Sequence, residues 1–224
     1  MKLLALETST GYCTVALRID GDTRYREELA GQRHSERVLP MADELLKEAG
    51  LRVKDLDAIA FGAGPGSFTG LRIACGCAQG LAFGAGLPVV PVGTLEALAE
   101  AAAAPSVAAC LDARMSQVYF AAFERIGTDW TPLIEPGLCD ASSAPLLAGS
   151  GWIGCGSGFE HYADALKQRL GASLSGIRPG LFPHAREVAA LGVRRFEAGR
   201  SVAPEEAAPV YIRDKVALKM SEQG

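Results

Sequence analysis

The chain has 224 residues, which suits one large domain or two lobes of about 100 residues each. Apolar residues make up 49% of it, enough for a buried core, and the net charge of −4 argues against a protein that grips nucleic acid through a basic face of its own. No apolar run approaches the roughly 18 residues of a membrane span, and Glu7 interrupts the N-terminal apolar run too early for a signal peptide.

The first half of the chain alternates strand patterns with helical patterns. Residues 56–62 form a continuous apolar run, which is typical of a strand covered on both faces. Residues 34–50 carry apolar side chains at helical spacing and end at a glycine. On this basis we expect strands over residues 2–7, 13–20, 23–30, 56–62 and 87–93, and helices over residues 34–50, 69–84 and 94–104.

A similar pattern begins again after a boundary at residues 104–106. The segment ALETSTGYCTVAL (5–17) aligns with CLDARMSQVYFAA (110–122), apolar on apolar, and places Glu7 on Asp112. This weak internal repeat predicts an α/β protein of two related lobes, residues 1–104 and 105–224. In the second lobe we expect strand, turn and strand over 106–127, a loop over 140–151, a strand over 152–158, helices over 159–171 and 186–199, and a tail over 201–219 that is first loop and then extended.

The six cysteines include no C-x-x-C pair, and most lie inside apolar runs. In a chain of this length that pattern indicates reduced core thiols, not a disulfide framework or a zinc site. We therefore expect a cytoplasmic protein that makes no membrane contact.

The stretch GAGPGSFTG (62–70) is rich in glycine and leads into a helix, as phosphate-binding loops do. A Walker loop needs a lysine after its last glycine, and the chain has no lysine between Lys54 and Lys167. The glycine spacing also fails the G-x-G-x-x-G dinucleotide fingerprint, and Pro65 lacks an N–H that an anion would require. A helix N-terminus capped by Ser67 or Thr69 could still bind an anion weakly.

The helix that follows this loop is rich in small residues, with Gly76 and Gly80 about one turn apart. Glycine inside a helix costs roughly 0.5–1 kcal/mol relative to alanine, so these positions indicate that another backbone comes close. Two interpretations remain open. The face packs on the helix at 34–50 of the same chain, or part of it packs on another subunit.

Six segments together resemble the TsaB (YeaZ) family: LLALETSTGYCTVAL, HSERVLPMADELL, GAGPGSFTGLRIACGCAQGLA, PVVPVGTLEALA, CLDARMSQVYFAAF and PVYIRDKVA. The resemblance implies an actin-like (ASKHA, ribonuclease H-like) two-lobed α/β fold with internal duplication. It also implies a non-catalytic subunit of the bacterial machinery that makes N6-threonylcarbamoyladenosine (t6A) in tRNA. Such a subunit binds and activates the catalytic paralogue TsaD and helps to recruit the ATPase TsaE.

The resemblance further implies that this chain lacks the metal site of the catalytic paralogue. The paralogue holds its metal with an H-x-x-x-H pair, and the matching positions here are Thr94 and Leu98. The three histidines of the chain lie far apart in sequence. We therefore expect no catalytic residue, no metal and no cofactor bound by this chain alone, with ATP and metal belonging to the partner subunits.

Four residues of the two hairpins form a possible vestigial cleft: Glu7, Thr8, Ser9 and Asp112. Two carboxylates facing each other across a cleft could perform acid–base work, and an actin-like ATPase or phosphotransferase that uses them with the 64–70 loop is the alternative function. A zinc glycoprotease-like peptidase is a more distant alternative. The favoured interpretation is that both acids only cap turns in a duplicated hairpin.

The docking surface for the paralogue is expected on the N-terminal lobe, from the helices at 35–49 and 69–84. In isolation the same face should pair two copies of the chain as a two-fold homodimer, and tRNA should be met only through the complex. The expected interface residues are Val38, Met41, Leu45, Thr69, Arg72, Ile73, Gly76, Cys77 and Gly80.

Overall fold

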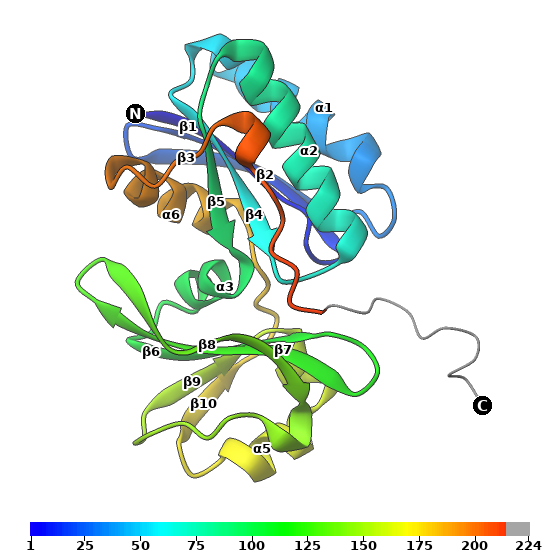
Figure 1. Cartoon of the computed structure of the whole chain (residues 1–224), viewed down its shortest axis with the longest axis vertical. Helices are drawn as coiled ribbons and strands as arrows, with labels where there is room; N and C mark the ends of the chain where they lie inside the picture. The colour runs from blue at the N-terminus through cyan, green and yellow to red at the C-terminus, as the bar shows by residue number, and fades with distance from the viewer. Residues whose placement is uncertain (214–224) are drawn as a thin grey trace.

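The computed structural model describes residues 1–213, which form two lobes, each built on a five-stranded sheet (Figure 1). The first sheet has the order β3-β2-β1-β4-β5, with β1 antiparallel to β2 and parallel to β4. Leu3 and Leu4 of β1 are both fully buried although they face opposite sides, so both faces of this sheet are covered. Its strands are β1 (Lys2–Glu7), β2 (Tyr12–Ile19), β3 (Asp22–Leu29), β4 (Ala58–Gly64) and β5 (Val89–Gly93).

The second sheet repeats the first strand for strand. Its order is β10-β9-β6-β7-β8, with β6 antiparallel to β7 and parallel to β9. The strands are β6 (Ser106–Asp112), β7 (Gln117–Ile126), β8 (Asp129–Asp140), β9 (Trp152–Cys155) and β10 (Leu174–Arg178). Strand β6 therefore occupies the place of β1, and the prediction of an internal duplication in a two-lobed α/β fold is confirmed.

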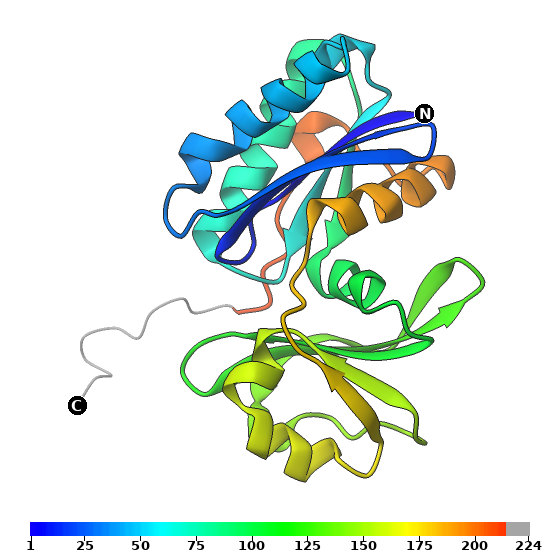
Figure 2. The same cartoon turned by 180° about the vertical axis from the view of Figure 1, so that it is seen from behind.

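Helices lie on both outer faces and between the two sheets (Figures 1 and 2). Helices α1 and α2 cover the outer face of the first sheet, and α4 and α5 cover the outer face of the second. Helices α3 and α6 lie between the sheets and share one apolar core with both of them. The helices are α1 (His34–Glu48), α2 (Phe68–Ala85), α3 (Thr94–Ala102), α4 (Ser157–His161), α5 (Ala163–Leu170) and α6 (Ala185–Glu197), with short 3-10 turns at Val53–Asp55, Ala141–Ser143 and Pro204–Glu206.

The predicted lobe boundary is wrong for the end of the chain. Helix α6 packs on the first sheet, where Gly192 lies so close to Ala60 that a Cβ on Gly192 would be 2.9 Å from the Ala60 Cβ. The chain then pairs Val202 with Val89 and continues along α2. Residues 185–213 therefore belong with residues 1–104, and residues 105–184 make up the second lobe. Residues 214–224, which were also predicted to belong to it, lie outside the described residues. An amphipathic helix shows which of its faces is apolar but not which sheet it will cover.

Two edge strands were not predicted, and one predicted helix is divided. Strand β8 is largely exposed and contains Pro132 and Pro136, so it lacks the apolar alternation of a strand. Strand β10 is short and contains Gly176. The helix expected over 159–171 is two helices, α4 and α5, which meet at Tyr162. Within residues 1–213, no helix combines the length and apolarity that crossing a membrane requires.

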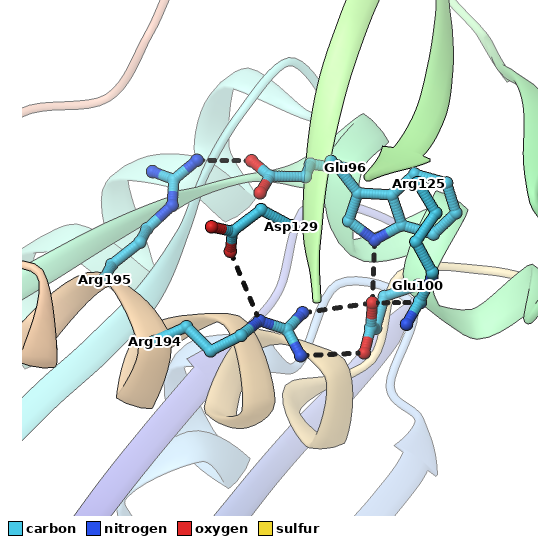
Figure 3. A network of polar contacts seen from close by, with 7 residues as sticks. Glu96, Glu100, Arg125, Asp129, Arg194 and Arg195 are labelled. Carbon is cyan, nitrogen blue, oxygen red and sulfur yellow. Dashed lines mark hydrogen bonds and ion pairs between the residues drawn. The ribbon is translucent and has the colours of Figure 1, made fainter. Parts of the chain in front are cut away.

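A polar network joins the two lobes where α3, α6 and the β7–β8 hairpin meet (Figure 3). The Glu100 carboxylate of α3 accepts hydrogen bonds from Arg125 Nη2 at 2.6 Å and from Trp130 Nε1 at 2.7 Å, and Arg194 Nη2 of α6 lies 3.1 Å away. Burial alone would raise the pKa of Glu100, but the hydrogen bonds from Trp130 and Arg194 and the charges of Arg194 and Arg125 lower it. One carboxylate thus ties the second lobe to the two central helices.

Candidate functional site

The glycine loop between β4 and α2 packs closely on the β1–β2 turn of the same chain. A Cβ on Gly70 would lie 1.9 Å from the carbonyl oxygen of Thr8, and one on Gly66 would lie 2.6 Å from the Ser9 Cβ. Thr8 Oγ1 donates to the Gly70 carbonyl at 2.7 Å, and Ser67 N donates to the Ser9 carbonyl at 2.8 Å. These glycines allow the loop to press on the β1–β2 turn, and that contact uses Ser67 N, which a phosphate cradle would leave open.

Glu7 is buried at the end of β1, and its carboxylate makes no ion pair with any residue from 1 to 213. Its Oε1 accepts a hydrogen bond from Ser9 N, whereas its Oε2 has no hydrogen-bond partner within the described chain. Gly62 packs directly on this carboxylate, since a Cβ there would be 1.7 Å from Oε2. Burial raises the pKa of Glu7 to about 7, so near neutral pH much of the carboxyl population is uncharged.

The two lobes enclose a cleft of about 1080 Å³. Of the four predicted cleft residues, Ser9 and Asp112 line it, whereas Glu7 and Thr8 are buried beneath its surface. Asp112 Oδ1 accepts a hydrogen bond at 2.8 Å from the backbone N of Arg114, two residues later. Glu7 accepts the equivalent hydrogen bond from the backbone N of Ser9. Both acids therefore cap the turn of a duplicated hairpin, and they do not face each other across the cleft.

The histidines and the cysteines of residues 1–213 do not assemble into a metal site. His34 is buried at the start of α1, with Nε2 at 2.9 Å from the Thr10 carbonyl, so it joins that helix to the β1–β2 turn. Thr94 and Leu98, at the positions where the paralogue would carry histidines, are fully buried in α3. Among residues 1–213, no cluster of three or more His, Cys, Asp or Glu side chains could hold a metal ion.

Helix α2 packs on α1 and shares its apolar core, but Gly76 and Gly80 take no part in that contact. Helix α2 buries Leu71, Ala74 and Ala78 against its own lobe, and its opposite face is exposed. A Cβ added at Gly76 or at Gly80 would meet no atom within 4 Å. The interpretation that the helix packs on the helix at 34–50 is therefore confirmed for other residues of α2 but does not explain these two glycines. The interpretation that another molecule approaches them stays open.

Three of the nine predicted interface residues are buried, so the prediction that they form the docking surface is wrong. Val38, Met41 and Leu45 lie on the inner face of α1, at most 3% exposed, because the helix uses them to cover the first sheet. The remaining six lie on α2, with Ile73 and Cys77 partly buried and the other four exposed; they are Thr69, Arg72, Ile73, Gly76, Cys77 and Gly80. We call these six residues the α2 face.

Two aromatic residues beside the α2 face were not expected from the sequence. The guanidinium of Arg72 lies 3.8 Å from the centre of the Phe68 ring, and its Nε donates to Tyr211 Oη at 2.9 Å. Phe68 could have been suspected from the helical spacing of four residues to Arg72. Tyr211 is 139 residues from Arg72 in sequence, so no local pattern connects them.

Comparison with known proteins gives consistent matches over nearly the whole chain. The chain is 38% identical to the tRNA threonylcarbamoyladenosine biosynthesis protein TsaB of Haemophilus influenzae, covering 98% of this chain and 96% of that one. It is equally similar, at 38%, to the TsaB of Escherichia coli K12, over 98% of this chain and 97% of the relative. The structure of YeaZ from Pseudomonas aeruginosa superposes with a TM-score of 0.86 at 38% identity, covering 94% and 99% of the two chains.

A family model also matches residues 27–151, namely TsaD, described as tRNA N6-adenosine threonylcarbamoyltransferase. A shorter match of 69 residues, 44% identical, is to a tRNA N6-adenosine threonylcarbamoyltransferase of Bordetella petrii, of which it covers 20%. The full-length relatives and the shared two-lobed structure extend well beyond that segment. The chain belongs to the TsaB (YeaZ) family.

Proposed function

We propose that this protein is a non-catalytic subunit of the bacterial t6A synthesis machinery, which binds and activates the catalytic paralogue TsaD through the α2 face and helps to recruit the ATPase TsaE. Membership of the TsaB family supports a part in t6A biosynthesis. The observation that carries the docking role is the open space over Gly76 and Gly80.

Glycine at these two positions has no purpose inside the described chain. Each glycine in a helix costs roughly 0.5–1 kcal/mol relative to alanine, and nothing within 4 Å would obstruct a methyl group at either site. No contact within the described chain compensates for this loss of helix stability, and a second backbone that approaches the helix at these positions would explain it. The partner's own helix would then come closest at Gly76 and Gly80, with Ile73 and Cys77 supplying apolar contact.

Three features support a docking role without chemistry. The glycine loop is occupied by the β1–β2 turn, Glu7 is buried with a pKa of about 7, and Thr94 and Leu98 cannot supply a metal-binding pair. ATP and metal are accordingly assigned to the partner subunits. Without its partner the α2 face pairs two copies of the chain, and tRNA is met only through the complex, in the cytoplasm.

The test of this proposal is substitution of Gly76→Arg, which places a long charged side chain in the middle of the α2 face. The matched control is Gln168→Arg, which adds the same charge to an exposed position of α5 in the second lobe. We expect Gly76→Arg to abolish co-purification with the paralogue and the control to retain it, while both variants keep wild-type circular dichroism. Equal affinity of the two variants would place the docking surface elsewhere.

A further inference from the structure

The tail beyond α6 reaches the α2 face and is fixed there at several points. Gln79 Nε2 of α2 donates to the Ala207 carbonyl at 3.0 Å, and Val210 N donates to the Ala63 carbonyl of β4 at 2.7 Å. Three residues later, Arg213 Nη2 donates to Gln117 Oε1 of the second lobe at 2.7 Å. Tyr211 is therefore held between anchors in both lobes, at the rim of the cleft.

This fixed tyrosine sets the position of Arg72. The Tyr211 hydroxyl accepts the hydrogen bond of Arg72 Nε, and the Phe68 ring supports the guanidinium from one side. The rings of Phe68 and Tyr211 are themselves 5.4 Å apart and tilted by 38°, so the arginine and the two aromatic rings form one cluster. With Nε engaged, the two Nη atoms remain, and no carboxylate among residues 1–213 lies within ion-pairing distance of them.

We propose that Tyr211 is a positioning residue which holds Arg72 ready for a single carboxylate of the catalytic paralogue, at the rim of the docking surface. This inference rests on the proposed function and names a specific contact within it. An arginine whose orientation is already fixed loses less conformational entropy when it pairs, and its two Nη atoms match the two oxygens of a carboxylate.

The surroundings of Arg72 favour a protein carboxylate over the phosphates of tRNA. Arg72 is the sole charged residue of α2, and the exposed positions that follow it on the helix are uncharged: Gly76, Gly80, Phe83 and Gly84. A surface that binds a polyanion needs several cations in a row, because each phosphate is neutralised separately. One preset cation beside an uncharged small-residue face suits one anionic side chain at the edge of a protein interface.

The experiment is a double-mutant cycle on affinity for the purified paralogue, with Arg72→Gln, Tyr211→Phe and the double variant. Phenylalanine keeps the ring and removes the hydroxyl, and glutamine keeps helix propensity while removing the charge. We expect Arg72→Gln to weaken binding about 30-fold, as for an arginine at an interface hot spot. Tyr211→Phe should weaken it about fivefold, as for one lost hydrogen bond, but only where Arg72 is present. Tyr25→Phe, a partly exposed tyrosine on β3, is the control and should bind as the wild type does.

Salt dependence supplies a readout that a purely structural role would not change. Added salt should weaken the wild type more than Arg72→Gln, because the variant lacks the ion pair. Additive effects of the two substitutions, or equal salt dependence, would overturn the inference even if Gly76→Arg abolishes the complex. Unchanged affinity for the paralogue together with weaker tRNA binding by the Arg72→Gln complex would also overturn it.

Discussion

The buried carboxyl of Glu7 makes the stability of the fold depend on pH in a way that one substitution can isolate. Glu7→Gln keeps the shape of the side chain and an oxygen that accepts from Ser9 N, and it removes the ionisable group. The folded pKa is about 7, compared with an ordinary value of 4.5, because the carboxyl is buried. At about 1.4 kcal/mol for each tenfold change, this difference corresponds to about 3 kcal/mol.

The direction in which the free energy of unfolding changes with pH follows from the number of protons that the folded and the unfolded states bind. Below pH 4.5 both states hold the proton, and the contribution of neutral Glu7 is fully present. Between pH 4.5 and about 7 only the folded state holds it, so the free energy of unfolding falls as the pH rises and levels off just above 7. We therefore expect Glu7→Gln to match the wild type near pH 4.5 and to exceed it by up to about 3 kcal/mol near pH 8.

The assay must compare the variant with the wild type, because His184 acts in the opposite direction. Burial, with a smaller effect from the charge of Arg186, lowers the pKa of His184 from 6.5 to about 4. The unfolded state then binds more protons between these values, so this histidine makes stability rise with pH and nearly cancels Glu7 below pH 6.5. Urea unfolding of both proteins across this range gives the difference directly. Parallel profiles would refute the conclusion that Glu7 is held neutral.

Three further predictions concern the lobe junction, the glycine face and the cleft. Glu100→Gln should destabilise the protein by about 2 kcal/mol, because Arg125 and Arg194 lose their shared carboxylate. The control is Glu205→Gln at an exposed position, which should cost almost nothing. Equal melting temperatures of the two variants would contradict the role of the network. Gly80→Ala should raise the free energy of unfolding by about 0.5–1 kcal/mol and yet weaken binding of the paralogue. A stabilised variant with unchanged affinity would show that the partner's backbone does not need to come close to α2. Isothermal titration with Mg-ATP should show no micromolar binding, and such binding, if lost in Glu7→Ala, would favour the ATPase alternative.

The sequence predicted the fold well where apolar patterns are strong. Two signals were sufficient to predict a duplicated two-lobed protein: the continuous apolar run that forms β4, and the repeat that aligns Glu7 with Asp112. The edge strand β8, which contains two prolines, and the placement of α6 on the first sheet carry no such local signal. Which sheet a helix covers depends on packing between residues distant in sequence, as in the contact of Gly192 with Ala60.

The candidate site was predicted less completely, for the same reason. Helical spacing placed Gly76 and Gly80 on one side of α2, and the structure shows that side to be exposed. The inner face of α1 was mistaken for surface because apolar residues such as Val38 suit a core and an interface equally well. Tyr211 could not be placed beside Arg72 from the sequence, since only the path of the tail brings them together.

The most direct test of the central claim is reconstitution of t6A formation on tRNA from purified components. Reactions would contain the catalytic paralogue, the ATPase and the threonylcarbamoyl donor, with no further subunit, with the wild-type chain, with Gly76→Arg or with Gln168→Arg. We expect modification with the wild type and with Gln168→Arg, and almost none with Gly76→Arg or without the chain. Modification at the full rate in the absence of the chain would contradict the account.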